Sequence, residues 1–253
     1  MENKVILIIG PTSSGKTKLS MEIAEYIKSF IKKDVAILNA DSRQIYKGLN
    51  IGTNKITSEE MRGIPHYLLS EVEPTNRLDT DNYKEMAEKL LEQLSKSSTV
   101  PIIVGGTATY FLALYGDYIL KQPKFGEKLE SDNILIITPK FESRDVLYRK
   151  VEESTEEMFK NGLFEEVKDL NRNQAFQLVL NTTLGYREFL EYSRRNRKKV
   201  EQLSYVDQQK IKWKIKTNTK KFAMNQINLL KKLDKVNTIE GDQYKDVINE
   251  FLK

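Results

Sequence analysis

Eight residues near the amino terminus have the spacing of a loop that binds phosphate groups. The pattern G-x-x-x-x-G-K-[ST] is matched by Gly10-Pro11-Thr12-Ser13-Ser14-Gly15-Lys16-Thr17. The glycines let backbone N–H groups converge on phosphate oxygens, and the amino terminus of the following helix adds a favourable dipole. Lys16 supplies a positive charge, and the Thr17 hydroxyl is a candidate ligand for Mg²⁺. The sequence therefore predicts a di- or triphosphate site at residues 10–17.

The phosphate loop alone is compatible with kinases, ATPases, GTPases and transferases, and the strand ends help to separate these classes. An ATPase of this kind carries a carboxylate at the end of an apolar strand. The strand-like runs Val100–Val104 and Ile134–Ile137 end without an acid. The acid at a strand end is Asp41, after the run Val35–Leu38. That position corresponds to the carboxyl edge of an open α/β sheet, where ligands bind.

Further motifs follow the phosphate loop in a fixed order. They are Asp41-Ser42-Arg43-Gln44-Ile45-Tyr46-Lys47-Gly48, Ile51-Gly52-Thr53-Asn54-Lys55, Gly63-Ile64-Pro65-His66 and Val104-Gly105-Gly106-Thr107. The series resumes at Leu147-Tyr148-Arg149-Lys150, Met158-Phe159-Lys160-Asn161-Gly162-Leu163, Gly185-Tyr186-Arg187-Glu188 and the basic stretch 216–231. Taken in this order, the motifs closely resemble those of the tRNA dimethylallyltransferase family (isopentenyl-diphosphate:tRNA transferases) over nearly the whole chain.

The resemblance implies that the phosphate loop holds the pyrophosphate of dimethylallyl diphosphate rather than ATP. The diphosphate-binding residues would be Gly10, Thr12, Ser13, Ser14, Gly15, Lys16, Thr17 and Lys150. Mg²⁺, with Thr17 as its protein ligand, would act with Lys16 to stabilise the leaving group. Ser154 stands where the family has an arginine that contacts the diphosphate. Lys150 lies one helical turn earlier on the same face and is the candidate replacement.

The resemblance also implies three catalytic residues, namely Lys16, Asp41 and Thr107. Asp41 would accept the proton from the exocyclic amine of an adenine as N6 attacks the prenyl carbon. Thr107 would hydrogen-bond near the amine or near Asp41. A positioned base of this kind contributes ~10²–10⁴-fold to the rate. Structural alternatives stay open, since Asp41 could cap the following turn and Thr107 could serve only the turn after two glycines.

The acceptor that the resemblance implies is the adenosine just 3′ of the anticodon in tRNA. Because the family binds this base in a buried channel, the base would leave the anticodon loop. The tRNA-binding residues would be Asp41, Ser42, Arg43, Gln44, Thr107, Arg187, Lys212 and Lys216. Arg187 has the alternative of a surface ion pair. His66 is expected to order its own loop by hydrogen bonding rather than to act in catalysis.

The positive charge of the chain is unevenly placed. The net charge is +5, and the stretch from Arg187 to Lys221 contains few acids. Its other cations are Arg194, Arg195, Arg197, Lys198, Lys199, Lys210, Lys212, Lys214, Lys216 and Lys220. Such a surface attracts polyanions in a salt-sensitive manner. A solvated helical face is the alternative, and the charge pattern alone does not decide between them.

These residues need a scaffold of alternating strands and helices. Continuous apolar runs predict buried parallel strands at Val5–Ile9, Val35–Leu38, Val100–Val104 and Ile134–Ile137. Helices are predicted at 16–30, 81–95, 143–161, 164–172, 186–199 and 205–233. This alternation implies an α/β fold of the P-loop NTPase type, with a parallel sheet flanked by helices. We expect a single domain over 1–253, with an α/β core at 1–140 and a mainly helical, basic, RNA-facing part at 141–253.

Departures from the family pattern keep other functions open. Family members carry a sizeable helical insertion after the Gly-Gly-Thr region, whereas only about 116–133 stands in its place here. The family's basic Ala-Lys-Arg-Gln pattern appears as Ala223-Met224-Asn225-Gln226, without its two cations. Beside tRNA prenylation, the alternatives are prenylation of a free adenine nucleotide, a non-catalytic RNA-binding relative and a P-loop kinase of a small molecule.

Composition narrows the chemistry further. The chain has no cysteine and a single histidine, which excludes disulfides and a thiol nucleophile and disfavours multi-histidine metal sites. A metal should therefore be a hard cation held by oxygen atoms. No run approaches the ~20 apolar residues of a membrane span. Because the first strand-like run begins at Val5, we expect no signal peptide ahead of the fold. We expect a cytoplasmic monomer with no membrane partner.

Overall fold

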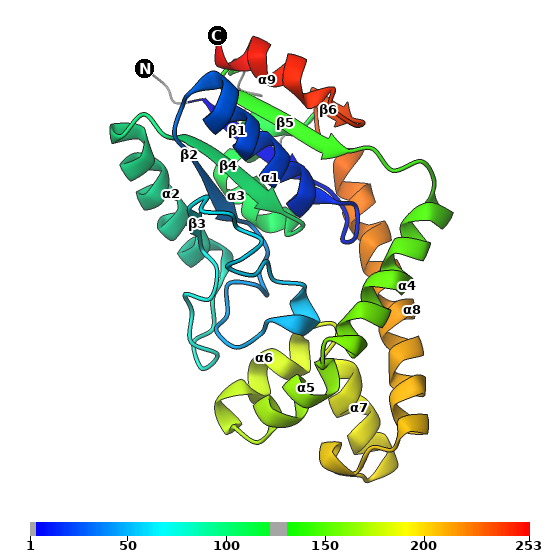
Figure 1. The fold of residues 1–253 in the computed structure, drawn as a ribbon. Coiled ribbons are helices and arrows are strands. Elements are labelled where there is room, and N and C mark those ends of the chain that lie inside the picture. The colour runs from blue at the N-terminus through cyan, green and yellow to red at the C-terminus, as the bar shows by residue number, and fades with distance from the viewer. Residues whose placement is uncertain (1–3, 122–130) are drawn as a thin grey trace.

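The computed structural model describes residues 4–121 and 131–253 (Figure 1). These residues include a six-stranded sheet in the order β3-β2-β4-β1-β5-β6, in which neighbouring strands are parallel. The strands are β1 (Val5–Ile9), β2 (Val35–Asn39), β3 (His66–Tyr67), β4 (Val100–Gly105), β5 (Ile134–Pro139) and β6 (Val236–Ile239). Every residue of β1 and β2 is buried, as expected where helices cover both faces of a sheet. The predicted α/β class is confirmed.

Helices lie on both faces of this sheet. The helices of the described residues are α1 (Lys16–Tyr26, continued by a π-helical turn at Ile27–Ile31), α2 (Thr80–Lys96), α3 (Ala108–Ile119), α4 (Arg144–Lys160), α5 (Leu163–Asn171), α6 (Gln177–Thr182), α7 (Arg187–Asn196), α8 (Tyr205–Leu230) and α9 (Tyr244–Leu252). Successive side chains of a strand point to opposite faces. Accordingly, Ile6 and Ile8 share a core with α1 and α9, whereas Leu7 and Ile9 share one with α2 and α3.

The helices after β5 extend away from the carboxyl edge of the sheet, and the chain then returns to it (Figure 1). α4 and α8 lie side by side, tied by ion pairs from Lys212 and Lys216 to Glu156. β6 then pairs with β5, and α9 packs on α1. The last residues therefore complete the sheet layer, whereas the division expected at residue 140 assigned them to the helical part.

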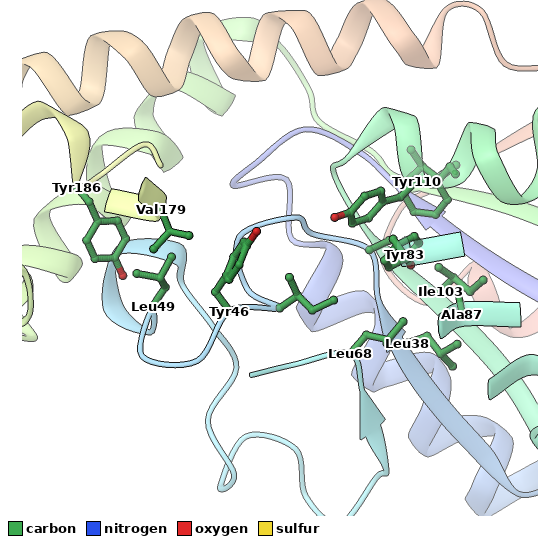
Figure 2. Close-up of a cluster of buried hydrophobic side chains, with 14 of the residues drawn as sticks. Leu38, Tyr46, Leu49, Leu68, Tyr83, Ala87, Ile103, Tyr110, Val179 and Tyr186 are labelled. Atoms are coloured by element: carbon green, nitrogen blue, oxygen red, sulfur yellow. The ribbon is translucent and has the colours of Figure 1, made fainter. Parts of the chain in front are cut away.

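A buried hydrophobic cluster joins the sheet layer to the helical part (Figure 2). Tyr83 of α2 and Tyr110 of α3 stack with their ring centroids 3.6 Å apart. The cluster continues through Tyr46 and Leu49, in the loop after β2, to Tyr186 at the start of α7. This loop begins at Asp41, so the packing of both parts of the molecule positions the residues that come after β2.

Several elements differ from the sequence-based prediction. The elements that were not predicted are β3, β6, α3, α6 and α9, and the stretch of about 116–133 that stands in place of the family's insertion begins with the last turn of α3. Residues 122–130 of that segment lie outside the described residues. Within the described ranges, each helix is too short or too polar to serve as a membrane span.

Candidate active site

The phosphate loop occupies the turn between β1 and α1, as its motif requires. Gly15 is the N-cap of α1 and has φ +91°, a conformation that favours glycine. Gly10 is tightly packed, since a Cβ atom there would lie 3.0 Å from the Ser14 hydroxyl. None of the described side chains caps the amino terminus of α1. Its first N–H groups therefore remain available for an anion.

Lys16 lies half-buried beneath the phosphate loop. Its Nζ donates a hydrogen bond to the Pro11 carbonyl oxygen at 2.7 Å. Desolvation lowers the pKa of Lys16 from 10.5 to about 8, and the Asp41 carboxylate opposes this shift. Lys16 is therefore mostly protonated at neutral pH, and its charge is within electrostatic reach of Asp41.

A cavity of about 480 Å³ lies against the phosphate loop and is called here the P-loop cavity. Its polar lining includes Lys16 and Thr17 from the loop and Lys150 from α4. Its apolar lining consists of Ile37, Ile56, Leu69, Val104 and Phe222. A cavity that combines cations with apolar side chains suits a ligand with an anionic group and a short hydrocarbon part.

A second cavity, of about 430 Å³, lies between the loop after β2 and the helices α7 and α8, and is called the helical cavity. Its lining includes Ser42, Arg43, Thr107 and Arg187, together with Asn218 and Lys221 of α8. The residues common to both cavities are Thr12, Asp41, Thr53, Asn54 and Phe222. The two cavities therefore meet beside Asp41.

Asp41 uses one carboxylate oxygen to hold its own loop. Its Oδ1 accepts hydrogen bonds from the backbone N–H groups of Arg43 and Gln44, at 2.8 and 3.3 Å. The turn-capping role left open by the sequence is therefore real. None of the described residues donates a hydrogen bond to Oδ2. That oxygen is the one left for a ligand where the cavities meet.

Close backbone packing places Thr107 against the same loop. A Cβ atom at Gly105 would lie 2.1 Å from the Ala40 carbonyl oxygen, so only glycine fits there. The Thr107 N–H donates to this carbonyl at 3.2 Å. The Thr107 Oγ1 accepts a hydrogen bond from the Ser42 N–H at 2.9 Å. Thr107 thus has a structural role, and its hydroxyl proton remains available to a ligand of the helical cavity.

Thr53 and Asn54 separate the two cavities, and sequence reasoning did not single them out. The 3₁₀ turn that contains Thr53 is fixed by Glu166 of α5, whose carboxylate accepts from the Ile51 N–H at 3.0 Å. Tyr186 donates to the same carboxylate at 2.7 Å. The family-like motif at 51–55 contained these residues, but its spacing gave no sign of a contact with α5. The wall between the cavities therefore depends on long-range packing.

Four of the residues predicted to bind tRNA lie in different places. Ser42, Arg43 and Arg187 line the helical cavity. Gln44 lines the P-loop cavity instead, and its Nε2 donates to the Thr53 carbonyl oxygen at 2.9 Å. Gln44 thus supports the wall between the cavities and is not grouped with the other three.

Arg187 and His66 both have partners close in sequence. Arg187 lines the helical cavity, and its Nε donates to Oε1 of the buried Glu188 at 3.2 Å. Cavity lining and ion pairing, which the sequence presented as alternatives, therefore occur together. His66 Nδ1 lies 2.8 Å from the Ile64 carbonyl oxygen, and burial lowers its pKa below 6.5. The expected hydrogen bonding of His66 within its own loop is confirmed.

Lys150 and Ser154 both line the P-loop cavity from α4. Ser154, at the position of the family arginine, has a local partner, because its Oγ accepts from Asn54 Nδ2 at 2.7 Å. Glu153 and Glu157 add carboxylates to the same lining. The α4 side of the cavity therefore carries a single lysine charge among acids.

Lys212 and Lys216, which were predicted to bind tRNA, form ion pairs within the protein. Both Nζ atoms lie 2.7 Å from the Glu156 carboxylate of α4, and the two side chains are only 12% and 22% exposed. Their hydrogen bonds lower the pKa of Glu156 to about 2. The reason is helical periodicity, since residues four apart share one face of α8 and this face meets α4.

Other lysines of α8 face solvent. Lys210, Lys214 and Lys221 are exposed, and within the described part of the chain none of them has an ion-pair partner. Their spacing places them along one side of the helix, and Lys221 also lines the helical cavity. Trp213 lies beside this row and is 66% exposed. The basic stretch therefore has one face that packs against α4 and another that faces solvent.

Comparisons with known proteins agree on one group. The family model described as "IPP transferase" matches residues 44–134 and 120–233. A tRNA dimethylallyltransferase of Thermoanaerobacter sp. (strain X514) is 28% identical, over 97% of this chain and 94% of that protein. Adenylate isopentenyltransferase 3, chloroplastic, of Arabidopsis thaliana is 32% identical, over 93% of this chain and 67% of that protein. The fold matches the crystal structure of a tRNA isopentenylpyrophosphate transferase from Bacillus halodurans with a TM-score of 0.80, at 22% identity and covering 99% of this chain and 96% of that one.

Proposed function

Because this chain belongs to the IPP transferase family, we propose that it is a prenyltransferase that modifies tRNA. It transfers a dimethylallyl group from dimethylallyl diphosphate to N6 of the adenosine just 3′ of the anticodon and releases diphosphate. The observation that carries this proposal is the meeting of two cavities beside Asp41. Two substrates that enter from opposite sides can react there without either one displacing the other.

The P-loop cavity suits the prenyl donor. Its diphosphate lies against the start of α1 and near Lys16, and its five-carbon chain lies against the apolar lining. Lys150 adds a second cation from α4 in place of the family arginine. Lysine supplies charge without the bidentate geometry of arginine, so this replacement gives weaker but still favourable binding.

The reaction makes one bond and breaks another. The N6 lone pair attacks C1 of the dimethylallyl group, and the electron pair of the C1–O bond leaves with the diphosphate. Asp41 Oδ2 accepts the proton that N6 loses, while Oδ1 stays bonded to the loop. The Thr107 hydroxyl donates toward the bound adenine in the helical cavity. Lys16 stabilises the negative charge that develops on the leaving group.

Mg²⁺ fits this site only as a partner of the diphosphate. The described residues contain no group of three or more acidic or histidine side chains that could hold a metal ion by themselves. Thr17 is an exposed residue and lines the P-loop cavity. Mg²⁺ is commonly held by one or two protein oxygens together with substrate phosphates and water. When bound, it would neutralise part of the charge on the leaving diphosphate.

A tRNA acceptor accounts for the outward-facing row of α8. Lys221 lines the helical cavity, whereas Lys210 and Lys214 lie beyond its lining and beside Trp213. A free nucleotide would occupy the helical cavity alone and would leave Lys210 and Lys214 without a ligand. A nucleic acid strand continues past the reacting base, so its phosphates can reach this row.

A free adenine nucleotide is the second candidate acceptor. It is favoured by the similarity to the adenylate isopentenyltransferase of Arabidopsis thaliana. It is also favoured by segments that the Thermoanaerobacter tRNA dimethylallyltransferase has and this chain lacks. The alignment of the two runs over 316 positions, whereas this chain has 253 residues, so the relative has segments without a counterpart here. We propose that a reduced insertion at about 116–133 accounts for part of this difference.

The test offers both acceptors to the pure protein in separate reactions with Mg²⁺ and dimethylallyl diphosphate. One reaction contains unmodified tRNA and the other contains AMP, and mass spectrometry measures N6-isopentenyladenosine in the digested nucleosides. Product from tRNA alone is expected. Product from AMP alone would replace the proposed acceptor with a free nucleotide. An absence of product from both, with tRNA still bound, would identify a non-catalytic RNA-binding relative.

A further inference from the structure

Gln226 of α8 contacts both the phosphate loop and the loop after β4. Its Oε1 accepts a hydrogen bond from the Thr12 N–H at 2.7 Å. Its Nε2 donates to the Gly106 carbonyl oxygen at 2.9 Å. The side chain is only 8% exposed, so water does not compete freely for either bond. One buried amide therefore ties together three segments that are far apart in the sequence.

The amide fits this position in one orientation. A flipped side chain would place its NH₂ group against the Thr12 N–H and its oxygen against the Gly106 carbonyl, so that both bonds would be lost. The neighbouring backbone also leaves little space. A Cβ atom at Gly106 would lie 2.2 Å from Gln226 Nε2. A side chain at Gly106 would therefore force the Gln226 amide to move.

The segments that Gln226 joins belong to both cavities. Thr12 lines the P-loop cavity and the helical cavity alike. Gly106 lines the P-loop cavity, as Gln226 itself does, and directly precedes Thr107, which lines the helical cavity. α8 itself contributes Asn218 and Lys221 to the lining of the helical cavity. An acceptor that binds against α8 therefore acts on the same helix that holds the phosphate loop at Thr12.

We propose that Gln226 is a positioning residue that couples binding of the acceptor base in the helical cavity to binding of diphosphate in the P-loop cavity. The inference rests on the proposed function, because it takes tRNA as the molecule that binds against α8. Coupling of this kind is reciprocal: tRNA raises the affinity for diphosphate by the factor by which diphosphate raises the affinity for tRNA.

The experiment measures this factor by binding, without turnover. Isothermal titration of inorganic pyrophosphate with Mg²⁺ gives its dissociation constant in the absence and in the presence of saturating unmodified tRNA. For the wild-type protein we expect tRNA to tighten pyrophosphate binding about fivefold or more, within the usual range of allosteric coupling. In Gln226→Met, which keeps an unbranched side chain but loses both hydrogen bonds, we expect the ratio to fall to about one.

Controls separate coupling from a structural role. Gln209→Met changes the same residue type on α8 at a site beside Trp213, and should keep the wild-type ratio. Gly106→Ala displaces the amide from the opposite side, so the ratio of pyrophosphate dissociation constants should fall to about one, as in Gln226→Met. It provides a second variant if Gln226→Met does not fold. A Gln226→Met protein that folds and keeps the wild-type ratio would overturn the inference, as would a wild-type ratio of one.

The binding assay tests the coupling separately from the proposed function. A wild-type protein that shows coupled binding of pyrophosphate and tRNA but makes no N6-isopentenyladenosine would refute the proposed reaction and leave the role of Gln226 intact. Conversely, a protein that prenylates tRNA equally well with and without the Gln226 bonds, and whose two ligands bind independently, would retain the function and refute the coupling.

Discussion

The two walls around Asp41 are built in different ways. One wall consists of the loops that leave the carboxyl ends of β1, β2 and β4, and there backbone hydrogen bonds hold the side chains, as they hold Asp41 Oδ1. The other wall includes α4, α7 and α8. There the direction of each side chain depends on its place in the helical period and on the helix that packs against it.

Lysine residues behave differently in the two walls. Lys16 belongs to the loop wall and lies in the P-loop cavity, where its motif predicts it. On α8, in contrast, residues of the same type have opposite environments within one turn. Lys214 is exposed, whereas Lys212 and Lys216 are paired with Glu156. A loop motif thus predicts the role of a side chain directly, but a basic helix does so only once its packing partner is known.

The largest effect is expected at Asp41, which we propose as the residue of the loop wall that accepts the proton. In Asp41→Asn the amide oxygen still accepts the N–H bonds of Arg43 and Gln44, so the loop is preserved, but the base is lost. We expect turnover with tRNA to fall by ~10²–10⁴-fold with little change in tRNA affinity. Steady-state kinetics and a filter-binding assay measure the two quantities. Wild-type turnover in Asp41→Asn would exclude Asp41 as the base.

A smaller effect, confined to the donor, is expected at Lys16. Removing one charged hydrogen-bond partner of an anion costs about 1.5–3 kcal/mol, which is roughly a 10- to 150-fold loss of affinity. Lys16→Met should therefore weaken binding of dimethylallyl diphosphate by this factor and leave tRNA affinity unchanged. Equilibrium titrations with each substrate measure the two affinities. An equal loss of tRNA affinity would show that the loop wall does not separate the two substrates.

The pH dependence of donor binding is a second test of the Lys16 charge. Burial lowers the pKa of Lys16 to about 8, so the free enzyme loses this charge as the pH rises through 8. We expect kcat/KM for dimethylallyl diphosphate to decline above this pH. Lys16→Arg, which stays charged throughout, should flatten the decline even if its overall rate is lower. An identical profile for the two proteins would assign the decline to another group.

The two faces of α8 offer a matched comparison on the helical wall. Lys210→Gln with Lys214→Gln removes two exposed charges, and should weaken tRNA binding and reduce its salt slope by roughly two. Lys212→Gln with Lys216→Gln removes the ion pairs with Glu156, and should lower stability by about 0.3–1 kcal/mol per pair, since Glu156 is 45% exposed. Salt titrations of tRNA binding and thermal unfolding are measured for both double variants. If the inward pair changed the salt slope as much as the outward pair, the assignment of faces would be wrong.

The parts of the fold that could be predicted from the sequence are those with a clear local pattern. Four central strands were predicted because each is a continuous apolar run between turns. The edge strands β3 and β6 were missed because β3 has two residues and β6 is partly exposed, so neither shows a clear pattern. α3 was missed because it is apolar on most sides and has a kink at Tyr115.

The site was predictable where it depends on local motifs. Lys16, Asp41 and Thr107 come together because parallel strands end at one edge of a sheet. Phe222 and Gln226 reach the same place only because α8 crosses that edge, about 100 to 200 residues later in the chain than the loops that it contacts. No local pattern encodes this crossing. The same holds for Lys212 and Lys216, whose partner Glu156 belongs to another helix.

The smallest expected effect is the pH dependence of the inward face of α8. Hydrogen bonds from Lys212 and Lys216 lower the pKa of Glu156 from 4.5 to about 2. Since the folded-state pKa lies below the unfolded value, this interaction stabilises the protein above about pH 4.5, and its contribution is lost as the pH falls toward 2. Because Glu156 is 45% exposed, solvent screening limits the contribution to less than about 1 kcal/mol.

Thermal unfolding of wild type and Glu156→Gln between pH 3 and 7 isolates this contribution, since other carboxylates titrate equally in both proteins. The difference in Tm should be largest near neutral pH and should shrink as the pH falls below about 4.5. Glu153→Gln on the same helix, whose carboxylate has no ion-pair partner among the described residues, should show no such trend. A pH-independent difference for Glu156→Gln would mean that Lys212 and Lys216 do not hold the carboxylate in solution. Both lysines would then be free to join the outward row in binding RNA, and the contrast between the two faces of α8 would disappear.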